Sequence, residues 1–84
     1  MTELLLPEIT VNGAERSVTS GASVADLVSE LTGRSIAADG RATDGTRLGV
    51  AVARNAAVVP RGRWSSTLLA AGDDIEIVTA VQGG

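Results

Sequence analysis

The C-terminal residues Gln82, Gly83 and Gly84 are the part of this chain that is best suited to covalent chemistry. They follow a strongly apolar segment, so we expect the Gly84 carboxylate at a defined distance from a folded body. Glycine has no Cβ, and Gly83 and Gly84 can therefore thread a narrow channel that a side chain would block. An exposed carboxylate of this kind is a natural acyl substrate. Activated as a mixed anhydride with AMP, it can accept sulfur or an amine.

The composition leaves this chain poorly equipped to supply a catalytic site of its own. Its 84 residues include no Cys, which excludes disulfides, thiolate metal sites and a cysteine nucleophile. They also include no His, the commonest general base and zinc ligand. A chain of this length buries only about 60–65% of its surface on folding and can hardly wall a deep cleft. We therefore expect a binding or carrier module with no catalytic residue and no metal ligand.

Charge and hydropathy restrict the partners. The net charge is −3 with a pI of about 4.7, which disfavours a nucleic-acid-binding protein. No apolar run approaches 18 residues, and the N-terminus lacks the pattern of a signal peptide. We expect a soluble cytoplasmic protein that does not bind membranes and is monomeric when free.

All seven basic residues are Arg. Without Lys, the chain has no side-chain amine that could capture an activated Gly84. Codon bias in a GC-rich genome explains the same observation more simply, so the absence of Lys does not decide the function.

The N-terminal half predicts a β-hairpin. Residues 9–11 alternate between apolar and polar side chains, and Asn12-Gly13 is the preferred two-residue hairpin turn. The return strand is expected over residues 14–19, with Val18 pointing inward. Residues 1–8 form a short lead before this hairpin.

A helix is expected after the hairpin. Ser23 has the character of an N-cap, Asp26 occupies the capping-box position, and Gly33 suits the position after the last helical residue. Apolar residues at helical spacing form one stripe, which consists of Val24, Leu27, Val28 and Leu31.

The second half returns to a β pattern after a Gly- and Arg-containing segment. Residues 34–47 are expected to form a flexible surface loop. Strands are then expected over 48–53, 57–59 and 75–81, with a short helical segment after Pro60. Trp64 is expected to fill the core beside two anchoring residues, Leu68 and Leu69.

These elements predict one α+β domain over residues 1–84. We expect a mixed sheet of four or five strands with one main helix on one face and a flexible tail over 82–84. The last strand should return to the middle of the sheet, beside the first strand, because its inward face is strongly apolar.

Two further groups of residues could carry function. The outward face of the sheet is expected to be small and apolar, and such a patch could dock a partner. Its expected members are Ala51, Ala53, Val78 and Ala80, with Arg61 nearby as a possible ion-pair donor. The pair Asp73-Asp74 could suggest acid catalysis or a metal, but two carboxylates at a tight turn are far more often turn residues.

Two runs in the second half resemble the ThiS family, the sulfur carriers of thiazole biosynthesis. They are Val-Val-Pro-Arg-x-x-Trp at residues 58–64 and Thr-Ala-Val-Gln-Gly-Gly at residues 79–84. The resemblance covers about residues 9–84 with a gap, because the loop at 34–47 is longer than the family leads us to expect. The lead at residues 1–8 is also extra.

The resemblance implies a ubiquitin-like β-grasp fold and a role as a protein co-substrate rather than an enzyme. A ThiF-like adenylating enzyme would use ATP and Mg²⁺ to adenylate Gly84 while Gln82 and Gly83 thread its active site. A sulfur donor system would then form a thiocarboxylate, and a ThiG-like thiazole synthase would accept the sulfur for thiamin. The chain itself would bind no cofactor.

Two other interpretations stay open on the sequence alone. A sulfur carrier of another pathway would share the fold and the tail; the small subunit of molybdopterin synthase is the main example, and carriers for cysteine or secondary metabolites are others. A non-catalytic β-grasp binding module is the more distant alternative. The acidity and the lack of stacking aromatic residues argue against single-stranded RNA as its ligand, and the absence of Cys excludes an iron–sulfur protein.

Overall fold

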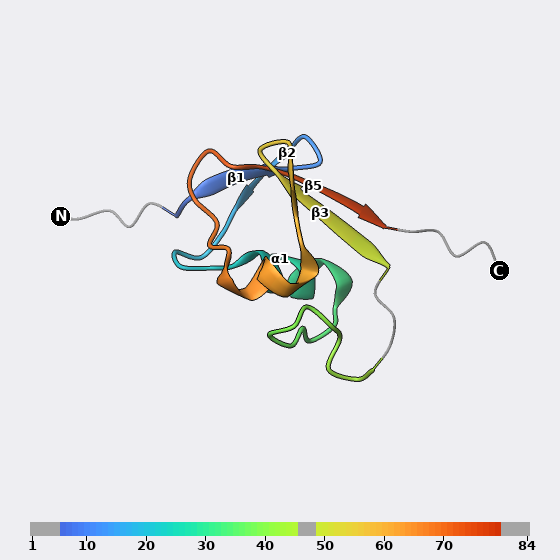
Figure 1. The fold of residues 1–84 in the computed structure, drawn as a ribbon. Helices are drawn as coiled ribbons and strands as arrows, with labels where there is room; N and C mark the ends of the chain where they lie inside the picture. Colours follow the sequence, from blue (N-terminus) through green and yellow to red (C-terminus); the bar gives the residue numbers. More distant parts are fainter. Residues whose placement is uncertain (1–5, 46–48, 80–84) are drawn as a thin grey trace.

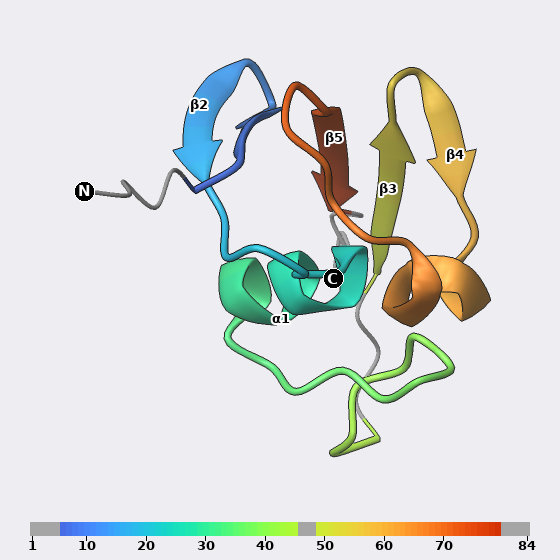
Figure 2. The same cartoon turned by 90° about the vertical axis from the view of Figure 1, so that its left-hand side faces the viewer.

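The molecule is built on a five-stranded mixed sheet with its main helix on one face (Figure 1). The structure is a computed structural model that describes residues 6–45 and 49–79. Figure 2 shows the sheet from one edge to the other, in the order β2-β1-β5-β3-β4, above the helix. The strands are β1 (Glu8–Val11), β2 (Ala14–Ser17), β3 (Val50–Arg54), β4 (Ala57–Val59) and β5 (Asp74–Thr79). The predicted α+β class is thereby confirmed.

Two tight hairpins frame the central strand. β1 and β2 are antiparallel and joined at Asn12-Gly13, where both residues have positive φ, as this turn requires. β3 and β4 are antiparallel and joined at Asn55-Ala56, again with positive φ at both positions. β5 lies between the hairpins, parallel to β1 and antiparallel to β3. The last strand therefore does return beside the first, as its apolar face predicts.

The main helix α1 (Val24–Thr32) begins with the predicted capping box. The Ser23 hydroxyl accepts from the Asp26 N–H at 3.2 Å, and the Asp26 carboxylate accepts from the Ser23 N–H at 2.9 Å. The predicted apolar stripe is wrong at one position, because Leu31 is 43% exposed. The end of α1 lies beside β2, which offers it Arg16 in a salt bridge to Glu30 rather than an apolar side chain. Within residues 6–45 and 49–79, no helix is long and apolar enough to cross a membrane.

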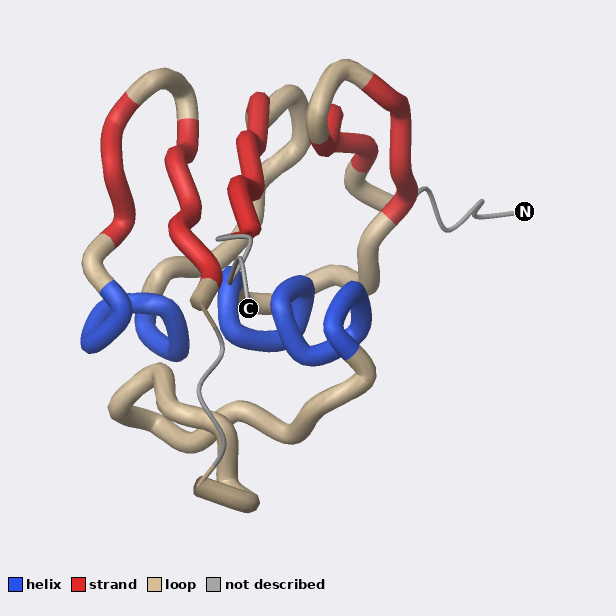
Figure 3. Tube along the Cα trace, turned by 90° about the vertical axis from the view of Figure 1, so that its right-hand side faces the viewer, coloured by secondary structure: helices blue, strands red, loops and turns tan. Residues whose placement is uncertain are grey.

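The core lies between the sheet on one side and α1 with a second, shorter helical element on the other. This element, the 3₁₀ helix η1 (Arg61–Ser66), carries the buried Trp64 beside α1 (Figure 3). The Trp64 indole N–H donates to the Val59 carbonyl at 3.0 Å, so its one polar atom is satisfied. Trp64 is thus the core residue that the sequence predicts. Of the two expected anchors only Leu69 is buried; Leu68 is 58% exposed because neighbouring residues in an extended segment point to opposite sides.

The segment after α1 has more structure than a flexible loop. Its described part, residues 34–45, lies on the side of α1 away from the sheet (Figures 1 and 3). An isolated bridge joins Ile36 to Ala42, which is buried, and the Ser65 hydroxyl of η1 donates to the Ala38 carbonyl at 3.1 Å. The sequence does not predict these contacts, because they are made at small residues such as Gly40 and Ala42, which carry little apolar signal.

Gly40 provides the clearest test of this packing. A Cβ at Gly40 would overlap both the side chain and the backbone carbonyl of Arg61. Gly45 in the same segment has an almost identical φ (79° against 82°) but open space around it. We predict that Gly40→Ala lowers the free energy of unfolding by about 1–3 kcal/mol more than Gly45→Ala, because overpacking adds to the shared backbone strain. Urea denaturation of both variants measures the difference; equal losses would show that the segment does not pack against η1.

Candidate functional site

The strand β5 leads directly into the C-terminal residues and is the central strand of the sheet. Its Ile75 is fully buried, and its neighbours are β1 on one side and β3 on the other. The chain therefore leaves the described body from the centre of the sheet and not from an edge (Figure 1). The residues singled out for acyl chemistry, Gln82, Gly83 and Gly84, lie outside the described residues, as do Ala80 and Val81. Their roles stay predictions.

A buried carboxylate anchors the start of β5. The Asp73 side chain accepts hydrogen bonds from Arg54 Nε at 2.8 Å, the Ala70 N–H at 2.8 Å and Asn55 Nδ2 at 3.1 Å. Burial alone would raise the pKa of this carboxyl, but the three hydrogen bonds and the Arg54 charge outweigh burial and lower the pKa. Asp73 also closes a turn through its own N–H, which donates to the Ala70 carbonyl. The interpretation of Asp73 as a turn residue is confirmed.

The outward face of the sheet carries exposed apolar side chains next to the end of β5. Ala51 lies directly opposite Val78 in the register, and Val78 is 63% exposed. Ala53 is half-buried and lies opposite Val58, which is 77% exposed. The face predicted from the sequence does not include Val58, although the alternation along β4 and the pairing of Val58 with Ala53 place it there. We call Ala51, Ala53, Val58 and Val78 the apolar face.

Arg61 lies beside the apolar face but not on it. The Arg61 guanidinium carbon sits 5.8 Å from the centroid of the Trp64 ring, a distance typical of a cation–π contact. An open hollow of about 340 Å³ is lined by Ala51, Val58 and Arg61, among others. The structure thus places Arg61 in the same hollow as two members of the apolar face, Ala51 and Val58.

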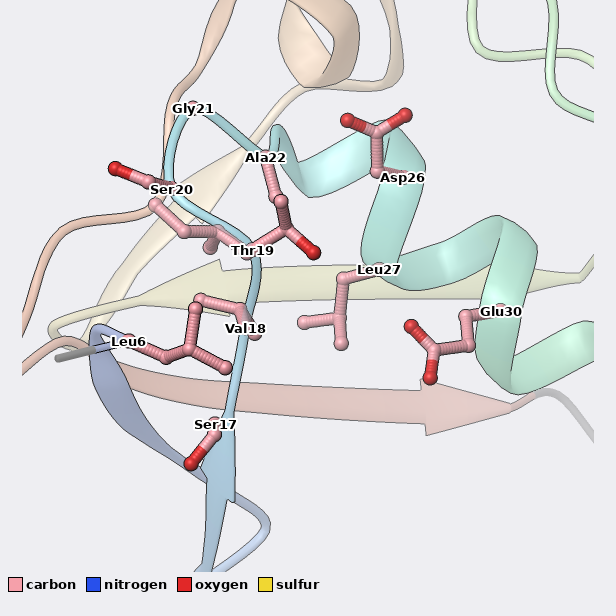
Figure 4. A pocket seen from close by; sticks show the side chains of 11 residues that line it. Leu6, Ser17, Val18, Thr19, Ser20, Gly21, Ala22, Asp26, Leu27 and Glu30 are labelled. Atoms are coloured by element: carbon pink, nitrogen blue, oxygen red, sulfur yellow. The ribbon is translucent and has the colours of Figure 1, made fainter. Parts of the chain in front are cut away.

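A second hollow lies on the helix side of the molecule (Figure 4). It measures about 370 Å³ and is bounded by the end of β2, the turn after it and α1. Both carboxylates in its lining already have partners, Asp26 in the capping box and Glu30 in the salt bridge to Arg16. None of its lining residues belongs to β5. Among its described lining residues this hollow therefore offers no carboxylate without a partner.

Comparison with known proteins decides between the families that this geometry allows. Residues 9–84 match the model of the ThiS family, and the match runs through both terminal glycines. The chain belongs to the ThiS family. The predicted resemblance is confirmed, and with it the ubiquitin-like β-grasp fold.

Solved structures support the same assignment for this ThiS-family chain. It is similar to the crystal structure of the thiamine biosynthesis protein ThiS from Geobacter metallireducens, with 25% sequence identity and a TM-score of 0.63. The similarity covers 92% of this chain and 99% of that chain. No curated protein sequence matches the chain.

The lowered pKa of Asp73 makes a prediction about acid stability. A carboxyl with a lowered folded-state pKa stabilises the protein fully above its unfolded pKa of about 3.9. That stabilisation is lost as the pH falls through the lowered value. We predict that Asp73→Asn lowers the free energy of unfolding by about 1–3 kcal/mol at pH 7, and that the gap to the wild type narrows below pH 4. Urea titrations at several pH values measure the gap; a gap independent of pH would contradict the assigned pKa.

Proposed function

We propose that this ThiS-family protein is a sulfur carrier of thiamin biosynthesis whose reactive group is the Gly84 carboxylate. The observation that carries the proposal is the family match through Gly84, at the end of a chain whose last strand is the centre of the sheet. A central strand presents the residues after it from a fixed point. A ThiF-like adenylating enzyme, a sulfur donor system and a ThiG-like thiazole synthase are the proposed partners.

The proposed chemistry takes place in the active sites of the partners. The Gly84 carboxylate attacks the α-phosphorus of ATP, pyrophosphate leaves, and an acyl adenylate forms. The terminal sulfur of a donor persulfide then displaces AMP and forms an acyl disulfide. A second thiol of the donor system attacks the donor's sulfur in this bond, so that a disulfide forms on the donor and the thiocarboxylate of Gly84 is released. ATP and Mg²⁺ are bound by the adenylating enzyme. The part of this chain is to hold the carboxylate in reach on a stable body.

The apolar face is the proposed docking surface for these partners. It adjoins the end of β5, so an enzyme that receives the C-terminal residues also lies over Val78 and Ala51. Glu76, the neighbour of Val78 on the same side of β5, is exposed and faces Ala53 in the register. A partner with an apolar patch and a nearby cation would complement this surface. Arg61 extends the proposed surface beside β4, and Ala80, which lies outside the described residues, is kept as a proposed member.

The covalent step can be followed by intact mass. Incubation with ATP, Mg²⁺ and a ThiF-like enzyme is expected to produce an AMP adduct, and addition of a sulfur source an oxygen-to-sulfur increment. Deletion of Gly84 should abolish both products while the thermal stability of the body stays unchanged. If the intact protein forms neither product with its adenylating enzyme, the carrier proposal is wrong. Assembly of this chain as the small subunit of a molybdopterin synthase, in place of sulfur transfer to thiazole synthase, would reassign the pathway.

Docking can be separated from chemistry with two charged substitutions. Val78→Asp introduces a carboxylate on the apolar face, whereas Leu68→Asp does so at a similarly exposed position (58% against 63%) outside this face. We predict that Val78→Asp raises the KM of the carrier in adenylation about tenfold or more, because an unpaired charge must be desolvated at the interface. Leu68→Asp should leave KM unchanged. Equal KM values for the two variants would remove the apolar face from the docking surface.

A further inference from the structure

The two neighbours of β5 do not accompany it equally far. β1 pairs with β5 only at Thr10↔Asp74 and Val11↔Ile75, whereas β3 continues to the pair Val50↔Thr79. Figure 1 shows β5 and β3 running on past the β1–β2 hairpin. Among the described residues, the half of β5 that leads to the C-terminal residues therefore has a neighbouring strand on one side only.

On the other side, the side chain of Asn12 takes the place of a strand residue. Asn12 Nδ2 donates to the Ile77 carbonyl at 3.2 Å, and the Ile77 N–H donates to Asn12 Oδ1 at 2.8 Å. A carboxamide offers the same donor and acceptor as a peptide group. It thus satisfies both backbone groups of Ile77 on this side, which in a longer parallel strand would bond to two different residues. The backbone N–H of Asn12 also donates to the Ile75 carbonyl at 2.9 Å. Asn12 therefore bonds to β5 at two residues, Ile75 and Ile77.

The hairpin turn makes this arrangement possible. Asn12 has a φ of 51°, in the left-handed region that Asn tolerates better than other residues with a Cβ. The main chain turns away toward β2 at this point, while the side chain stays in line with β1. Thr79 is the next residue of β5 whose peptide groups face this side, because alternate residues face alternate sides. Within residues 6–45 and 49–79, no backbone hydrogen bond reaches Thr79 from this side.

We propose that Asn12 is a positioning residue for the C-terminal acyl chemistry. Its amide holds β5 in place up to Ile77, so that the chain leaves Thr79 at a fixed point and in a fixed direction. This inference rests on the proposed carrier function. Without the amide, the end of β5 gains freedom that it must lose again on binding the adenylating enzyme, and the cost appears in KM and not in kcat.

Asn55 offers a matched control in the same protein. It has the same φ of 51° at the same position of the second hairpin turn. Its amide also contacts β5, because the Asp74 N–H donates to Asn55 Oδ1 at 2.9 Å and Asn55 Nδ2 donates to the Asp73 carboxylate. These bonds lie at the start of β5, at the opposite end of the strand from Thr79. Gly is compatible with both turns, so Asn12→Gly and Asn55→Gly remove the amides and keep the hairpins.

The first measurement is amide hydrogen exchange of the free protein, which needs no partner. Asn12→Gly is expected to raise the exchange rate of the Ile77 N–H about tenfold or more, and Asn55→Gly to raise that of the Asp74 N–H instead. An unchanged Ile77 rate in Asn12→Gly would overturn the proposal at this stage.

The second measurement is steady-state adenylation by the ThiF-like enzyme, followed by pyrophosphate release. Asn12→Gly is expected to raise KM for the carrier about three- to tenfold with kcat within twofold of the wild type. Asn55→Gly should leave both constants unchanged at a temperature where all three proteins are folded. Equal KM changes in both variants would reduce Asn12 to a structural residue and leave the carrier function intact. A wild type that is not adenylated would overturn the carrier function and this inference together.

Discussion

The position of β5 is the constraint on which the rest of the structure depends. The last of the described strands is the central strand of the sheet, and it lies between the β1–β2 and β3–β4 hairpins. Side chains of both hairpins secure it, Asn12 at Ile77 and Asn55 at Asp74. A strand held in this way is a suitable support for the proposed reactive terminus, because hydrogen bonds from both hairpins oppose its displacement.

The two sides of β5 separate stability from recognition. Its inward residue Ile75 is fully buried against α1 and η1, and the same side holds Trp64 and the remaining core. Its outward residues Glu76 and Val78 are exposed and make no part of that core. The alternation of a single strand therefore lets the surface change to suit a partner while the core stays as it is.

Local signals in the sequence predict much of this fold, and the misses are non-local. Ser23 with Asp26 and Asn12 with Gly13 are recognised because capping and turn chemistry involve residues close in sequence. Leu31 is misjudged because its exposure depends on what β2 places beside the end of α1. Leu68 is misjudged because it alternates with the buried Leu69 in an extended segment, and the bridge from Leu68 to the distant Ser23 is not visible in the sequence. The place of Val58 on the apolar face and the hydrogen bonds from the Asn12 and Asn55 side chains to β5 are not predicted for the same reason, since both depend on strand register. The Gly84 chemistry is inferred from the sequence and the family alone.

The packing of residues 34–45 beneath α1 has a practical consequence for work with this protein. The segment and the apolar face lie on opposite sides of the molecule, with the sheet and the helix between them. The entropic cost of closing a loop grows only slowly with its length, so an insertion in this segment is tolerated. A label or affinity tag placed at its exposed turn near Gly45 would point away from an enzyme bound at the apolar face. Carrier and partner could thus be captured or visualised together without a label on the proposed docking surface.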